Sequence, residues 1–278
     1  MKRMVLMLRD GLSRVGLTLH PTKCKVQANN NEFDTRGDVL LAEGFTIEVL
    51  NAGECLELLG TTISLEDPTG AEIDNRISSG WKKFWALKRL LLNRSISRTK
   101  RLRLFDYSVA ECVLWGCESW TLRAEEFRRL SVVQNMMLRR IAVMGRADGE
   151  VWVDWVRRAT SRIRGVAGEL GLKEWGPEHF RRKWRWAGQV ATTSAVEWLG
   201  KVTEWRDSAW QAAAADWGSF RPRRPSARRW MRFEDCLRRF CQERGLGGWR
   251  EVASDSSTWH DRPVQAQYHS QLPSLVVV

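Results

Sequence analysis

The sequence has few of the residues on which most active sites depend. Among 278 residues there are only two tyrosines and four histidines, and the histidines stand in unrelated contexts. No Gly-x-Ser-x-Gly pentapeptide, phosphate-binding loop or dinucleotide fingerprint occurs, which argues against nucleophilic hydrolysis, nucleotide hydrolysis and hydride transfer. No two aspartates are adjacent, although polymerases usually hold catalytic Mg²⁺ with such a pair. The sequence alone therefore offers no catalytic centre.

Long apolar stretches are missing as well. No window of about 18 apolar residues occurs, so no transmembrane helix is expected, and the apolar run before Arg9 is too short for a signal peptide. We expect an intracellular protein, in the cytoplasm or the nucleus, without a membrane partner. The six cysteines should be free thiols. The pairs Cys112/Cys117 and Cys236/Cys241 are five residues apart, wider than structural zinc prefers, and no metal site is expected.

Positive charge is what the chain has in excess. Lysine plus arginine number 45 against 33 acidic residues, a net charge of +12, and the isoelectric point is about 9.9. The excess is concentrated in residues 71–145, with 15 cations and 7 anions, and in residues 219–278, with 11 and 6, whereas residues 1–70 hold 7 and 10. Such asymmetry points to a nucleic-acid partner. It is also compatible with ordinary solvated helix faces.

Hydrophobic periodicity predicts a mostly helical chain with a small N-terminal antiparallel β part, an α+β fold. A short helix should end at Gly16 and Lys23–Gln27 should be a strand, with a hairpin at 39–50, a strand pair at 56–63 and a closing turn at 68–70. Apolar residues then repeat at three and four, which is typical of helices. Ser97 and Thr121 are candidate N-caps.

Charge, proline and tryptophan divide the chain into five segments. They are an N-terminal part with the predicted strands (1–70), a helical bundle (71–145), a tryptophan-rich helical region (146–218), a basic helix after an Arg/Pro linker (219–253) and a disordered tail (254–278). Most of the 16 tryptophans should be core residues. The RRKWRW cluster at 181–186 is an exception, because its cations and indoles interleave in a way that suits nucleic acid.

Several strings occur in an order and spacing found together in one protein family. They are VGLTLHPTKCKV (15–26), CLELLGTTIS (55–64), EIDNRISSGWKKFWALKRLL (72–91), KRLRLFDYSVAECVLWGCESWTL (100–122), LSVVQNMMLRRI (130–141) and KWRWAGQVA (183–191). Together they resemble the end of the palm, the thumb and the following region of reverse transcriptases from non-LTR (LINE-like) retrotransposons. The resemblance covers roughly residues 5–191.

The resemblance implies roles for particular residues. Lys23 would be the palm lysine that assists pyrophosphate departure, and Leu59, Gly60 and Thr61 would form a primer-grip-like hairpin. The candidate contacts to a nucleic-acid backbone, from the resemblance and from the charge pattern, are Arg76, Lys82, Lys83, Lys100, Arg101, Arg103, Arg139, Arg140, Arg181, Arg182, Lys183, Arg185, Arg228, Arg229 and Arg232. The expected partners are RNA, DNA or an RNA–DNA hybrid.

The sequence also departs from the family. It starts just after the place of the catalytic Asp-Asp motif, and Leu58 replaces an aromatic residue in the grip. Mg²⁺ is implied only for the complete family enzyme, and no cofactor is expected for this chain. Three interpretations stay open: a truncated, inactive protein that still binds nucleic acid, a part of an active RNA-directed DNA polymerase completed by another chain or exon, or a non-enzymatic helical relic.

Overall fold

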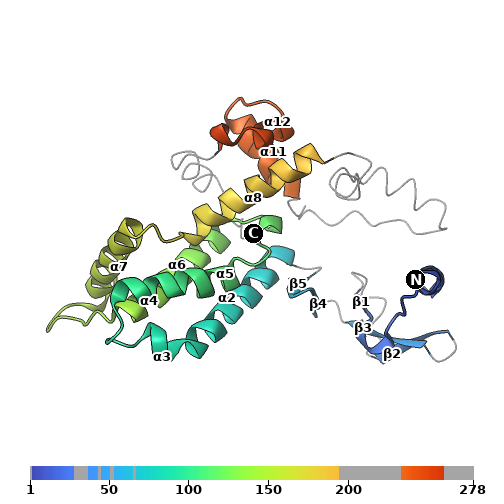
Figure 1. Ribbon diagram of the computed structural model, residues 1–278, viewed down its shortest axis with the longest axis horizontal. Helices are drawn as coiled ribbons and strands as arrows, with labels where there is room; N and C mark the ends of the chain where they lie inside the picture. The colour runs from blue at the N-terminus through green and yellow to red at the C-terminus, as the bar shows by residue number, and fades with distance from the viewer. Residues whose placement is uncertain are drawn as a thin grey trace. The chain divides into compact units, whose positions relative to one another are not determined.

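The computed structural model describes residues 2–27, 37–42, 45–50, 53–64, 67–193 and 233–259. It divides the chain into two compact units, Met1–Asn75 and Arg76–Val278 (Figure 1). The fold is mostly helical with a small N-terminal β part, which confirms the α+β prediction. Over the ranges that the structure describes, every helix is too short or too polar to span a lipid bilayer.

The first unit begins with the expected helix, α1 (Lys2–Arg14). Gly16 follows it with a φ of +77°, a left-handed conformation that glycine adopts without strain. The amide of Leu17 donates to the carbonyl oxygen of Leu12 at 3.0 Å, which closes the helix end. A 3-10 turn, η1 (Pro21–Lys23), then leads into strand β1 (Lys25–Gln27).

Three strands form the first sheet, in the order β1-β3-β2. β2 (Gly37–Ala42) and β3 (Phe45–Leu50) pair antiparallel, as the predicted hairpin requires. β1 lies on the other side of β3 and pairs with it in parallel, so the β part is antiparallel in its two hairpins and parallel at this strand. The reason is topological: a strand added to the second strand of a hairpin can run either way, and the sequence does not specify the direction.

The second sheet is the predicted hairpin, β4 (Leu56–Leu58) with β5 (Thr61–Ile63). Leu59 and Gly60 connect the strands with φ values of +50° and +80°, the combination that a type I′ turn needs. The amide of Thr62 donates to the buried carboxylate of Glu72 at 2.5 Å. This contact ties the hairpin to the first turns of helix α2 (Pro68–Ala86).

Residues 68–70 begin helix α2, and the prediction that they form a closing turn is wrong. Proline is favoured in the first turn of a helix because its missing N–H has no partner there. The side chain of Asp67 accepts a hydrogen bond from the amide of Gly70 at 3.2 Å, as an N-cap residue does. The Pro-Thr-Gly string was therefore a helix start.

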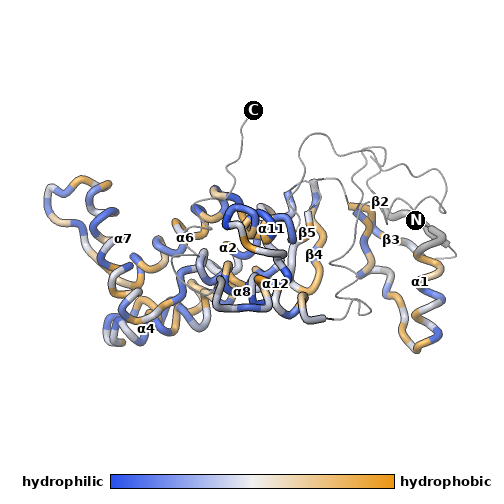
Figure 2. Tube along the Cα trace, turned by 90° about the horizontal axis from the view of Figure 1, so that it is seen from above, coloured by the Kyte–Doolittle hydropathy of each residue, from blue (hydrophilic) through white to orange (hydrophobic). Residues whose placement is uncertain are grey.

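Helices build the second unit, and hydrophilic and hydrophobic residues alternate along them as expected of helices that bury one face (Figure 2). After α2 come α3 (Lys88–Leu91), α4 (Arg98–Phe105), the π-helical turn η2 (Asp106–Ala110), α5 (Glu111–Val113), η3 (Cys117–Ser119), α6 (Ala124–Ala142), α7 (Trp152–Glu169), α8 (Trp175–Thr192), α11 (Phe233–Glu243), α12 (Trp249–Ser254) and η4 (Ser256–Thr258). Helix α6 contacts α4, α7 and α8.

The predicted N-cap residue is confirmed for α4 and wrong for α6. The side chain of Ser97 accepts from the amide of Lys100 at the start of α4, as predicted. The N-cap residue of α6 is Arg123 instead of Thr121, because the Arg123 amide donates to the side chain of Glu126, as in a capping box. A glutamate three residues into the helix thus decides the start.

Tryptophan supplies much of the interior. Trp175 and Trp184 are fully buried, as predicted for most indoles, and Trp152 is 61% exposed. Trp184 stacks on Trp259, with ring centroids 6.3 Å apart, and Trp259 is buried. The folded chain therefore extends past residue 254, where we expected a disordered tail.

Candidate nucleic-acid interface

A run of 31 residues, 75–105, contains ten cations and no carboxylate. We call it the basic segment; it covers most of α2, all of α3 and α4, and the link between them. Asp74 precedes it and Asp106 follows it. Because no acid is present within the segment, none of its own residues neutralises its charge, and its exposed cations would attract a polyanion.

Eight of the ten cations are exposed. Within the described part of the chain, none of these eight side chains makes an ion pair or a hydrogen bond, so their charges are available to a ligand. They come from α2, α3, the link and α4: Lys82, Lys83, Lys88, Arg89, Arg94, Arg98, Lys100 and Arg103.

The other two cations of the basic segment, Arg76 and Arg101, are only 7% and 6% exposed. The Arg101 guanidinium donates to the carbonyl oxygens of Leu91, Ile96 and Ile141 at 3.2, 3.0 and 2.6 Å. These bonds hold the link between α3 and α4 against the end of α6. Arg101 is therefore a structural residue, and the structure does not place it on the exposed face with Lys100 and Arg103.

The arginines of α6 lie in different surroundings. Arg139 donates to the Thr160 hydroxyl at 2.7 Å, and burial, with the neighbouring charge of Arg140, lowers the pKa of its guanidinium. Arg140 is exposed, and its guanidinium carbon lies 5.2 Å from the ring centroid of Trp81 and 5.8 Å from that of Trp85. Arg140 of α6 thus packs against two indoles of the basic segment and adds its charge beside the exposed cations.

Most residues of the RRKWRW cluster are buried or paired within the protein. Lys183 is 1% exposed; its ammonium donates to the carbonyl oxygen of Trp120 and lies 4.6 Å from the Phe233 ring centroid. Arg181 and Arg182 pair with carboxylates of the protein. Arg185 is exposed, and it is the member of the cluster that a nucleic acid could reach directly.

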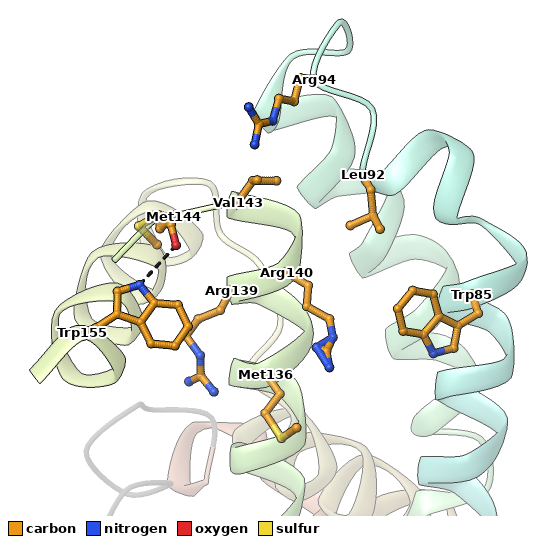
Figure 3. Close-up of a pocket in the computed structure, with 10 residues that line it drawn as sticks. Trp85, Leu92, Arg94, Met136, Arg139, Arg140, Val143, Met144 and Trp155 are labelled. Atoms are coloured by element: carbon orange, nitrogen blue, oxygen red, sulfur yellow. Dashed lines mark hydrogen bonds between the residues drawn. The ribbon is translucent and has the colours of Figure 1, made fainter. Parts of the chain in front are cut away.

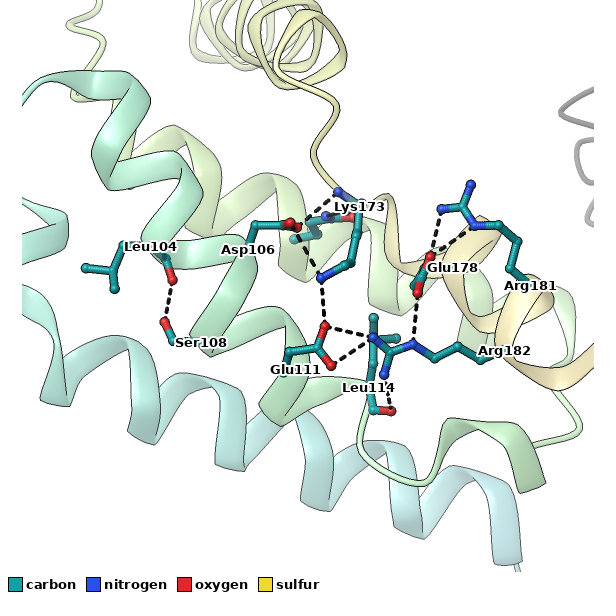
Figure 4. A network of polar contacts seen from close by, with 10 residues as sticks. Leu104, Asp106, Ser108, Glu111, Leu114, Lys173, Glu178, Arg181 and Arg182 are labelled. Carbon is teal, nitrogen blue, oxygen red and sulfur yellow. Dashed lines mark hydrogen bonds and ion pairs between the residues drawn. The ribbon is translucent and has the colours of Figure 1, made fainter. Parts of the chain in front are cut away.

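Arg182 belongs to a polar network that joins α5 to α8 (Figure 4). Its guanidinium donates to both carboxylate oxygens of Glu111, at 2.7 and 2.8 Å, and to Glu178 at 2.9 Å. Lys173 donates to Glu111 at 2.7 Å. Burial acts to raise the pKa of Glu111, but the hydrogen bonds from Lys173 and Arg182 outweigh it and leave the pKa below its usual value.

The remaining predicted site residues lie elsewhere. Lys23 is exposed at the end of η1, and Leu59, Gly60 and Thr61 form the β4–β5 turn and its exit, where Leu59 is 89% exposed. These four residues belong to the first unit. The last three predicted contacts lie outside the described residues: Arg228, Arg229 and Arg232.

A pocket of about 730 Å³ opens beside the basic segment (Figure 3). Trp85 and Arg94 line it from α2 and the α3–α4 link, and Arg139 and Arg140 line it from α6. Trp155 of α7 forms a further wall, and its indole N–H donates to the carbonyl oxygen of Met144 at 3.2 Å. The pocket therefore combines aromatic faces with guanidinium groups.

Comparison with known proteins gives a distant relationship. Over 258 residues the chain is 26% identical to an uncharacterised transposon-derived protein of Caenorhabditis elegans, an alignment that covers 89% of this chain and 82% of that protein. This chain is related to a transposon-derived protein. No protein-family model matches it, and no solved structure is similar to it at a significant level.

Sequence reasoning missed the pocket. Hydrophobic periodicity predicts a helix here but does not distinguish adjacent aromatic residues, and Trp85 is 47% exposed whereas Phe84 is fully buried. The available signal was the surrounding segment: an indole within 31 residues that contain no acid is better placed to meet an anionic aromatic ligand than to fill a core.

Proposed function

We propose that this chain is a retrotransposon-related protein that binds the phosphate backbone of an RNA–DNA hybrid through its basic segment, as the thumb of a non-LTR reverse transcriptase would. The observation that carries the proposal is the basic segment itself, in which eight exposed cations have no partner among the described residues. The sequence strings that resemble non-LTR reverse transcriptases and the transposon-derived relative support the same assignment. Together they favour a nucleic-acid role over a purely structural one.

Backbone binding fits the type and placement of these cations. A hybrid helix is held mainly through its phosphates, because its deep major groove is closed to side chains. Each phosphate that a lysine or arginine neutralises releases a counterion, which makes the affinity depend on salt. No reaction is assigned to the chain, since its sequence contains no adjacent aspartates for two-metal chemistry.

The test is a fluorescence-anisotropy titration of a blunt RNA–DNA hybrid at several salt concentrations. We expect submicromolar binding at low salt and a log–log slope of about −4 or steeper, which corresponds to roughly four or more neutralised phosphates. Replacing Lys100 and Arg103 of α4 with glutamate should weaken binding by about tenfold or more and make the slope shallower by roughly 2.

The matched control replaces Arg162 and Arg164 of α7, which are also exposed, with glutamate. Both double variants lower the net charge by the same amount, so a difference between them reports position instead of total charge. We expect the control to retain the wild-type affinity within about threefold. Equal losses in the two variants, or equal wild-type affinity for any polyanion such as heparin, would overturn the proposal.

A further inference from the structure

The pocket beside the basic segment has a lining suited to more than a phosphate. Its walls carry two indoles, Trp85 and Trp155, on different helices, and Met136 contributes to its floor. Trp85 stacks on Trp81 with ring centroids 6.2 Å apart, and nearly half of its surface is exposed. The stacking and the Trp155–Met144 hydrogen bond hold both indoles in place, so that a flat ligand would meet a preformed site.

The charged groups of the pocket all have one sign. Arg94, Arg139 and Arg140 line it, and among the described residues its lining includes no carboxylate. Arg139 is held by Thr160, and Arg140 lies against the indoles of Trp81 and Trp85. Arg94 on the α3–α4 link makes no ion pair or hydrogen bond with the described residues. Figure 3 shows Arg140 and Trp85 on facing helices, with Arg94 at the rim. A ligand that is both flat and anionic satisfies these groups together.

We infer that this pocket binds an unpaired nucleotide of a single-stranded overhang, with its base against Trp85 and its phosphates near Arg94 and Arg140. The inference rests on the proposed function, because the basic segment would hold the adjoining duplex. Indoles stack on any base, so the site would have little sequence preference. A volume of about 730 Å³ lies within the range typical of ligand pockets and is adequate for a base with its sugar and phosphate.

The experiment compares three hybrids that share one duplex: blunt, with a short DNA overhang, and with an overhang of the same length built from abasic residues. The two overhangs carry equal charge, so their difference isolates the bases. Base stacking on an aromatic side chain is worth about 1–3 kcal/mol, so the wild type should prefer the base-bearing overhang by about fivefold or more. A 2-aminopurine placed in the overhang should be quenched on binding.

Variants of Trp85 decide whether the preference arises in this pocket. Trp85→Ala should abolish the preference and leave the affinity for the blunt hybrid unchanged, whereas Trp85→Phe should retain part of the preference. Trp115→Ala is the matched control, because Trp115 is 58% exposed and does not line the pocket. We expect it to behave like the wild type. Circular dichroism and thermal melting of each variant would show that the fold is intact.

The outcomes separate the inference from the function on which it rests. Equal affinity for the two overhangs, or a preference that survives Trp85→Ala, would overturn the pocket assignment even if the blunt hybrid binds well. If the blunt hybrid does not bind but the isolated overhang strand binds with a preference for bases over abasic residues, the proposed function is overturned. The assignment of the pocket would then still hold. Displacement of the overhang by an equal concentration of free nucleoside monophosphate would overturn the assignment to a strand.

Discussion

The guanidinium of Arg101 donates a hydrogen bond of 2.6 Å to the carbonyl oxygen of Ile141, 40 residues further along the chain. Ile141 is in the last turn of α6, where carbonyl groups lack partners within the helix. The same guanidinium also donates to the carbonyl oxygen of Leu91, at the end of α3. One buried arginine thus satisfies two helix ends, and its charge is used to hold the bundle together.

Replacing Arg101 with methionine should therefore destabilise the protein. The substitution keeps much of the side-chain volume but leaves three carbonyl groups, two of them at buried bonds, without their donor. Unsatisfied buried groups cost about 1–3 kcal/mol each, and we expect a loss of about 2–4 kcal/mol in the free energy of unfolding. Urea denaturation followed by circular dichroism measures it.

Arg103 provides the control, because it is exposed two residues further along the same helix. Arg103→Met should change the free energy of unfolding by less than about 0.5 kcal/mol. Similar stability of both variants would show that the Arg101 bonds contribute little. The pair also shows why Arg101 is a poor choice for a binding test, since its loss would weaken binding through the fold.

Two glycines in helices should respond to alanine in opposite directions. Gly188 in α8 lies against α12, and a Cβ atom there would be 2.8 Å from the carbonyl oxygen of Ala253. Backbone cannot yield as a side chain can, so Gly188→Ala should cost about 1–3 kcal/mol. Gly165 in α7 has open space around it, and Gly165→Ala should stabilise the protein by about 0.5–1 kcal/mol.

Urea denaturation midpoints of the two glycine variants test the packing of α8 on α12 directly. A stabilising effect of alanine at both positions would mean that the two helices do not approach each other as closely as the structure has them. A destabilising effect at both would instead point to a requirement for glycine in α7 that its surroundings do not explain.

Local signals predicted the elements better than they predicted side-chain roles. Period and cap residues were sufficient for α1, the two hairpins and the start of α4, because these depend on neighbours in sequence. The direction of β1 and the burial of Lys183 depend on partners far along the chain. Lys183, for example, is buried by Trp120 and Phe233, which are distant in sequence, and nothing in the RRKWRW string predicts that.

The candidate interface was predicted in part for the same reason. Net charge located the basic segment, since charge is a property of the sequence itself. Which cations are exposed is a property of the packing: Lys100 and Arg103 face solvent, and Arg101 between them does not. The pocket needs α2, α6 and α7 together, so no single stretch of sequence could predict it.

Thiol reactivity offers a test of the fold that is independent of nucleic acid. Cys55 is exposed, whereas Cys117 and Cys241 are buried. Burial raises the pKa of the Cys117 thiol, and it raises that of Cys241 to about 11 despite the opposing charge of Arg244. At pH 8 an aromatic disulfide reagent should therefore modify Cys55 rapidly and the two buried thiols only after unfolding.

The variant Cys55→Ser identifies the rapid phase of that reaction. It should remove the fast phase in native protein and leave the total number of thiols released in denaturant lower by one. Rapid modification of Cys117 or Cys241 in the native protein, detected by mass spectrometry of peptides, would contradict their burial.

The network around Glu111 predicts a loss of stability in acid. Its pKa is below the ordinary value of 4.5 in the folded protein, because Lys173 and Arg182 favour the charged carboxylate over the opposing effect of burial. A carboxyl group whose pKa is lowered by folding stabilises the native state above its unfolded pKa, and this contribution is lost as the pH falls through the folded value. Since the Glu111 side chain is 42% exposed, the contribution should be modest, about 1 kcal/mol at neutral pH.

Glu111→Gln should therefore be less stable than the wild type at pH 7, and the difference should shrink as the pH falls below about 4. Glu125→Gln, at an exposed carboxylate on α6, should show no such difference at either pH. If the wild type and Glu111→Gln unfold at the same urea concentration at pH 7, the bridge between α5 and α8 does not stabilise the fold.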